Sequence, residues 1–145
     1  MEKEIKELNA AVADAYGYII KASKNPDGIS GVPSGFIELD KLTSGWQNGE
    51  LIAIGARPAM GKTAFISSML KQITVDYKTP ALLFSLESNA QQVAHRMMAN
   101  ICEIPNEKIK SGQLADDEWQ QLDYKLRDLL DAPLYIDDTP SLRIE

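Results

Sequence analysis

One nine-residue segment constrains the fold of this chain more than any other. Its residues are Gly55, Ala56, Arg57, Pro58, Ala59, Met60, Gly61, Lys62 and Thr63. They match the phosphate-binding pattern G-x-x-x-x-G-K-[ST]. An apolar run at residues 50–54 predicts a buried strand before the segment, and residues 63–71 predict a helix after it. Because a phosphate-binding loop lies between a strand and a helix, this context favours a true site over a glycine turn with a chance lysine.

The chemistry expected of such a loop assigns a role to each kind of group in it. Successive backbone N–H groups bind phosphate oxygens, and the N-terminus of the following helix adds partial positive charge. Lys62 is expected to reach the β- and γ-phosphates of ATP, and the Thr63 hydroxyl to bind Mg²⁺. Gly55 and Gly61 permit backbone angles and close approaches that a Cβ would prevent.

Composition narrows the class of protein. The chain has 145 residues, about one domain, with 44% hydrophobic and 25% charged residues. We find no apolar run near the roughly 20 residues of a membrane span and no signal-peptide pattern. The single cysteine, Cys102, is expected to be a buried apolar residue. These features predict a cytoplasmic protein. The net charge is −6, and the sequence shows no basic patch of the kind that binds nucleic acid.

Helical and strand patterns alternate along the chain, which predicts an α/β fold with a parallel sheet and right-handed crossovers. Further strands are expected at 81–86 and 134–136, giving three with residues 50–54. Helices are expected at 2–24, at about 37–42, from Ser88 with a Ser88–Gln91 capping box, and at 116–130. A turn is expected at 105–109. Ligands of such sheets bind at the carboxyl ends of the strands.

Apolar spacing also predicts which side chains face a core. We expect three residues of the short helix and five of the last helix to point inward: Phe36, Leu39, Leu42, Trp119, Leu122, Leu126, Leu129 and Leu130. The first helix has a stripe formed by Ile5, Leu8, Val12, Tyr16, Ile19 and Ile20. That stripe fits the protein's own core and a partner subunit equally well.

Three carboxylates are candidates for chemistry. Glu87 directly follows the strand at 81–86, on the sheet edge where the phosphate loop ends, so it could polarise a water for attack on the γ-phosphate. Alternatively, it is a solvated residue that favours the next helix dipole. Asp137 and Asp138 follow an apolar run, as in a Walker B strand, or they begin a turn with Thr139.

Several segments together resemble the DnaB family of replicative DNA helicases. The resemblance rests on residues 30–40, on residues 49–63 with Arg57-Pro58 and Met60 inside the loop, on Phe84-Ser85-Leu86-Glu87, on residues 109–114 and on Tyr135-Ile136-Asp137-Asp138. It covers the chain from about residue 28 onward and extends more loosely to the first helix. The resemblance implies a RecA-like P-loop ATPase core, truncated here, at residues 29–145, preceded by a linker helix at residues 1–28.

The resemblance also implies function and partners. It implies that Glu87 is the catalytic base, that the protein uses ATP and Mg²⁺, and that the Walker B aspartate lies beyond Asp138. It implies a homo-hexamer that acts on single-stranded DNA and meets a primase and a helicase loader, with the linker helix packed on a neighbouring subunit. DNA-contacting loops and the arginine finger lie outside these 145 residues, so we expect the chain alone to be inactive. Two alternatives stay open. The chain could belong to another RecA-type ATPase, such as a recombinase-like protein, or it could be a non-catalytic fragment that binds nucleotide or forms oligomers.

Overall fold

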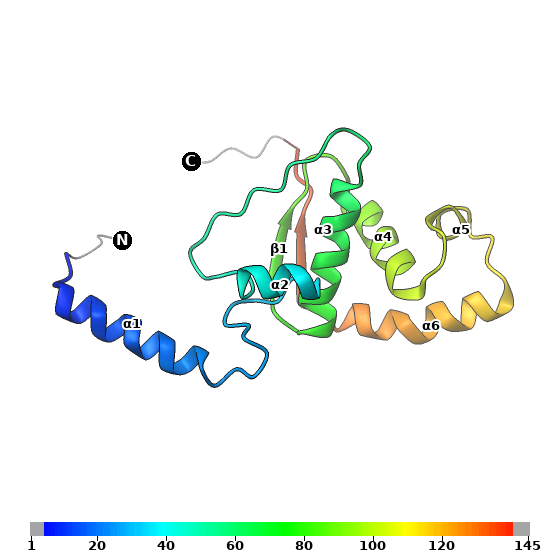
Figure 1. Cartoon of the computed structure of the whole chain (residues 1–145). Coiled ribbons are helices and arrows are strands. Elements are labelled where there is room, and N and C mark those ends of the chain that lie inside the picture. The colour runs from blue at the N-terminus through cyan, green and yellow to red at the C-terminus, as the bar shows by residue number, and fades with distance from the viewer. Residues whose placement is uncertain (1–4, 141–145) are drawn as a thin grey trace. The chain divides into compact units, whose positions relative to one another are not determined.

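The computed structural model describes residues 5–140, and its elements form two compact units that divide between Glu50 and Leu51 (Figure 1). The first unit holds α1 (Leu8–Ala22) and α2 (Ile37–Thr43). The second holds α3 (Lys62–Lys71), a π-helical turn η1 (Gln72–Asp76), β1 (Ala81–Phe84), α4 (Ala90–Cys102), α5 (Asn106–Ser111), α6 (Asp116–Leu130) and β2 (Leu134–Asp137). The proposed domain boundary after residue 28 stays a prediction.

The predicted first helix is confirmed as α1, although it begins later and ends earlier than expected. Residues 1–4 lie outside the described residues, and Ile5 precedes the helix. None of the α1 side chains is buried. The apolar stripe is exposed in the described chain, with exposed fractions of 79% for Leu8, 58% for Val12, 64% for Tyr16 and 60% for Ile19.

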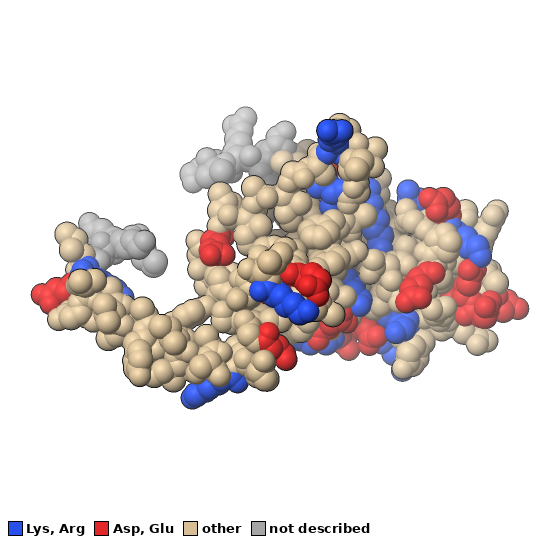
Figure 2. All heavy atoms as spheres, viewed as in Figure 1, with Lys and Arg blue, Asp and Glu red and all other residues tan. Residues whose placement is uncertain are grey.

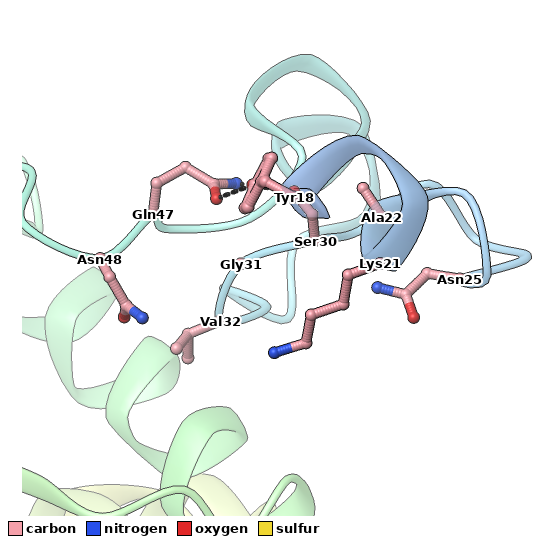
Figure 3. A pocket seen from close by; sticks show the side chains of 9 residues that line it. All are labelled: Tyr18, Lys21, Ala22, Asn25, Ser30, Gly31, Val32, Gln47 and Asn48. Atoms are coloured by element: carbon pink, nitrogen blue, oxygen red, sulfur yellow. Dashed lines mark hydrogen bonds between the residues drawn. The ribbon is translucent and has the colours of Figure 1, made fainter. Parts of the chain in front are cut away.

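Tyr18 connects α1 to the rest of the first unit (Figure 3). Its hydroxyl donates to Gln47 Oε1 at 2.6 Å and lies 2.8 Å from Ser30 Oγ. Because a tyrosine has one hydroxyl hydrogen, Ser30 is the donor in the second bond. Beside this network lies a cavity of about 640 Å³, which Lys21 and Asn48 also line.

A buried carboxylate organises the loop before α2. Asp40 is 2% exposed, and its two oxygens accept from the backbone N–H of Ser34 at 2.7 Å and of Gly35 at 3.1 Å. Close by, the chain forms an antiparallel bridge between Val32 and Trp46. A side chain at Gly31 would overlap the Trp46 carbonyl group, so this crossing requires glycine.

The second unit contains a parallel pair of strands. β1 and β2 pair from Ala81 opposite Leu134 to Phe84 opposite Asp137, which confirms two of the three expected strands. The strand expected at residues 50–54 was wrong: this segment is not part of a strand, and Leu51 is 98% exposed. A strand exists only when a neighbour completes its hydrogen-bond ladder, and no described residue pairs with this segment.

β1 is exposed on one of its two faces. Leu82 and Phe84 are 58% and 56% exposed, because the described residues cover one face of the sheet only.

α4 is the central helix of the second unit and packs against α3, α5 and α6. Its Val93, Met97 and Cys102 are almost fully buried, which confirms the expected burial of Cys102. The helix begins at Ala90, so the predicted Ser88 cap was wrong: Asn89 caps it by accepting from the Gln92 N–H at 2.8 Å.

Other boundaries and faces also differ from expectation. Residues expected to form a turn at 105–109 lie mostly in the short helix α5. The predicted last helix is confirmed as α6. Two of its predicted inward residues, Trp119 and Leu130, are nevertheless 46% and 75% exposed. Leu42 of α2, also predicted to point inward, is 85% exposed. Apolar spacing identifies the side of a helix that favours burial, but no described segment covers these positions.

We expect Asp40→Ala to loosen the first unit. The substitution leaves the Ser34 and Gly35 N–H groups without their acceptor, and an unsatisfied buried donor costs about 1–3 kcal/mol. The amide hydrogens of both residues should then exchange at least about tenfold faster in a hydrogen-exchange NMR measurement. Glu38→Ala on the same helix is the control, because its side chain is 84% exposed. Unchanged exchange in Asp40→Ala would contradict the described loop.

We also expect the Cys102 thiol to react only after the second unit unfolds. Burial raises the pKa of this thiol, and the residue is 1% exposed, so both the thiolate fraction and access are low. Ellman's reagent at pH 8 should label it slowly in buffer and rapidly in urea. A Cys102→Ser, Ser23→Cys variant, with its thiol on an exposed position, should react at once in buffer. Fast labelling of the original chain without urea would contradict the packing of α4.

Candidate phosphate-binding site

The predicted loop borders a cavity of about 590 Å³ in the second unit. Residues 56–64 line one side of it, and Glu87 and Arg96 line the rest. Two loop residues have left-handed backbone angles, Ala59 at φ +63° and Gly61 at φ +84°. Gly61 directly precedes α3, so the loop turns into the helix at a position that favours glycine.

The two predicted phosphate and metal ligands lie in the first turn of α3. Lys62 begins the helix, and the Thr63 side chain is half-buried one residue later. The first N–H groups of any helix have no partner within it. At α3 these groups adjoin the cavity, where the helix dipole favours an anion. The structure therefore places Lys62, Thr63 and a helix N-terminus at one cavity.

Lys62 and Glu87 face each other across the site. Lys62 Nζ lies 3.8 Å from Glu87 Oε1, and the two side chains are 44% and 76% exposed. This proximity confirms that the loop and the residues after β1 share one site, although the strand expected before the loop is not formed. Gly55, in contrast, lies just outside the lining and lacks the positive φ that would require glycine.

The turn between β1 and α4, which carries Glu87, is held by side chains. Ser85 Oγ donates to the Ser88 carbonyl oxygen, and Arg96 Nη1 donates to Ser88 Oγ at 3.0 Å. Sequence reasoning did not identify Arg96. The available signal was its position three residues after Val93 and one before Met97, which puts a charged residue on the buried side of α4.

The two aspartates after the apolar run of β2 are engaged elsewhere. Asp137 Oδ1 accepts from the Thr139 N–H at 2.9 Å, which confirms the turn alternative. Hydrogen bonding from Thr139, through its side chain and then its backbone, holds the pKa of Asp137 below its ordinary value. Asp138 Oδ2 accepts from the Ala90 N–H at 2.7 Å, at the N-terminus of α4. Neither residue lines the phosphate cavity.

The charges around the cavity suit an anionic ligand. Arg57, Lys62 and Arg96 contribute three cations to its lining, against the single carboxylate of Glu87. Elsewhere acidic side chains are prominent: on the face that Figure 2 shows, they gather with some basic ones over the α5 and α6 part of the second unit.

A bound Mg²⁺ would depend on few protein ligands. Among residues 5–140 no group of three or more His, Cys, Asp or Glu side chains is arranged to hold a metal ion. Thr63, which lines the cavity, carries a hydroxyl oxygen of the kind that can bind Mg²⁺ beside phosphate oxygens and water.

No helix in the described part of the chain has both the length and the apolar character needed to cross a membrane.

Comparison with known proteins identifies the family of this chain. The sequence model of the DnaB-like helicase C-terminal domain matches residues 31–145. The chain is 38% identical to the replicative DNA helicase DnaB of Geobacillus stearothermophilus over 143 residues, which are 98% of this chain and 31% of that protein. It is 37% identical to DnaB of Nostoc sp. over 98% of this chain and 14% of that protein. The chain thus spans less than a third of these relatives.

Solved structures give the same result. One of them, described as an ATPase domain, superposes with a TM-score of 0.84 at 31% identity, over 94% of this chain and 47% of that one. A DnaB-like replicative helicase, described with its interactions with primase, superposes with a TM-score of 0.77 at 31% identity, over 94% of this chain and 32% of that one. The fold is therefore a RecA-like ATPase core. With a family match over residues 31–145 and relatives of that name along nearly its whole length, the chain belongs to the family of DnaB-like helicase C-terminal domains.

Proposed function

We propose that this chain forms the nucleotide-binding part of a ring-shaped replicative helicase motor. In such a motor, ATP hydrolysis drives translocation along single-stranded DNA and separation of the duplex. The observation that supports this proposal best is the cavity in which Lys62 Nζ lies 3.8 Å from Glu87 Oε1, beside the N-terminus of α3. The cation, the helix N-terminus and the carboxylate are the groups that phosphoryl transfer requires.

The loop residues bind the triphosphate. Residues from Ala56 to Thr63 line one side of the cavity, so their backbone N–H groups can contact phosphate oxygens, which the α3 dipole also attracts. Lys62 contacts the β- and γ-phosphates, and Thr63 binds Mg²⁺ through its hydroxyl. The metal, when bound, neutralises charge that develops on the phosphate oxygens.

Glu87 acts as the general base. It lies in the turn that follows β1 and lines the same cavity as Lys62. A carboxylate there can accept a proton from the attacking water, a contribution of about 10²- to 10⁴-fold to the rate. Lys62, opposite it, stabilises the charge on the transferred phosphoryl group.

α1 provides a contact to a neighbouring subunit. Its exposed apolar stripe, from Leu8 to Ile19, has no cover within the described residues. A stripe of this kind buries itself on another surface when one is offered. We propose that in a homo-hexamer it packs on the adjacent motor domain. From the family we also propose single-stranded DNA, a helicase loader and a primase as partners. The net charge of −6 gives these residues little attraction for DNA.

A second candidate applies to the 145 residues by themselves: a nucleotide-binding or oligomerisation unit without turnover. It is favoured by Asp137 and Asp138, because the hydrogen bonds of these carboxylates keep them on the Thr139 turn and the α4 N-terminus. Glu87 is then the only carboxylate among the described residues that lines the phosphate cavity. A recombinase-like ATPase, the other alternative, lacks support from the family match at residues 31–145.

We expect Mg-ADP and Mg-ATP to stabilise the 145-residue chain against heat and Lys62→Ala to remove the effect. A ligand at about 100 times its dissociation constant adds roughly 2.7 kcal/mol, a shift of several degrees in Tm for a domain of this size. Lys110→Ala, an exposed position on α5, is the matched control. Equal shifts in Lys62→Ala and the original chain would contradict a phosphate site at this loop.

We expect Glu87→Gln to lower ATP turnover by about 10²- to 10⁴-fold while nucleotide binding is retained. The measurement is steady-state ATPase in a protein that carries this segment within a complete DnaB-like motor. Gln keeps the shape of the side chain and loses its basicity, so binding should change little. Glu107→Gln on α5 is the control, since it lies outside the cavity lining. Loss of nucleotide binding with unchanged kcat would exclude Glu87 as the base.

A further inference from the structure

Glu87 depends on its surroundings for its direction. Its carboxylate lies 3.8 Å from the Lys62 ammonium, and its side chain is 76% exposed. The residue lies in a turn without regular secondary structure between β1 and α4. The direction of a flexible side chain in such a turn depends on the interactions that fix the neighbouring backbone.

Ser88 is the residue that fixes this backbone. Its carbonyl oxygen accepts from Ser85 Oγ within the turn, and its hydroxyl oxygen accepts from Arg96 Nη1 at 3.0 Å. The first bond is internal to the turn. The second connects the turn to α4, one residue away from Glu87 in the sequence.

Arg96 is well suited to act as this anchor. It is half-buried on α4, between Val93 and Met97, which are each 3% exposed, so its backbone is fixed by the core. Its guanidinium group reaches back toward the start of the helix and lines the cavity with Lys62 and Glu87. Arginine has five donors in a rigid plane, so its guanidinium group can hold Ser88 Oγ in a fixed direction.

We propose that Arg96 is a positioning residue, which holds the Ser88 turn so that the Glu87 carboxylate points toward the phosphate loop. This inference rests on the proposed role of Glu87 as general base. Arg96 acts through Ser88 and does not itself bind the nucleotide. Misplacement of a catalytic group by about 1 Å costs roughly 10²-fold in rate, so loss of the anchor should reduce the rate and leave affinity intact.

The test is steady-state ATPase in a protein that carries this segment within a complete motor. Arg96→Ala should lower kcat by about 10- to 100-fold, with KM for ATP and the Mg-ADP shift in Tm close to the original. Ser88→Ala, a small change in a turn, should have a similar effect. The double variant should be no worse than the more severe single one, because both remove the same bond.

Two further variants separate positioning from general structure. Arg96→Lys keeps a donor and should recover part of kcat, whereas Arg127→Ala on α6 removes the same charge outside the cavity and should change nothing. Additive losses in the double variant would overturn the proposal, as would an unchanged kcat in Ser88→Ala. A lost Mg-ADP shift in Arg96→Ala would also overturn it and would make Arg96 a direct phosphate ligand.

The controls also separate this proposal from the proposed function. If Glu87→Gln does not lower turnover, the role of Glu87 fails and the positioning role fails with it. If Glu87→Gln lowers turnover and Arg96→Ala does not, only the role assigned to Arg96 is wrong.

Discussion

The packing of α3 against α4 determines whether this chain has a site at all. α3 carries Lys62 at its N-terminus, and the turn into α4 carries Glu87. Buried side chains on both helices, with a hydrogen bond from Asn100 Nδ2 to Ser68 Oγ at 3.0 Å, keep them in register. A slip of one helical turn would move one helix by about 5.4 Å, more than the 3.8 Å that separates the two charged groups.

The local features of the site could be predicted because they are encoded in adjacent residues. The phosphate loop and α3 follow from residues 55–71 alone, and the family resemblance followed from a few such segments. The meeting of Glu87 with Lys62 was expected from the parallel-strand argument, and it occurs even though only one of the two strands in that argument is formed. Arg96 was not found, because its role depends on a side chain that folds back eight positions to Ser88.

Burial was predicted less well, and the reason is physical. An apolar pattern shows that one face of a segment favours removal from water, but it does not show which surface removes it. Leu42, Leu51 and Leu130 all follow such patterns and are 85%, 98% and 75% exposed. The strand expected at 50–54 is the same case: its residues have strand propensity, yet a ladder needs a neighbour, and none is present among the described residues.

The ion pair between Lys62 and Glu87 places two charged groups at the cavity but adds little to the stability of the fold. An exposed ion pair contributes about 0–1 kcal/mol, and these side chains are 44% and 76% exposed. Lys62 can therefore exchange its carboxylate partner for phosphate oxygens at little cost, since a triphosphate offers more negative charge than one glutamate. The core around Val93 and Met97 supplies the stability of the unit. Because the two tasks fall on different residues, the charged groups can change partners while the helices that hold them stay in place.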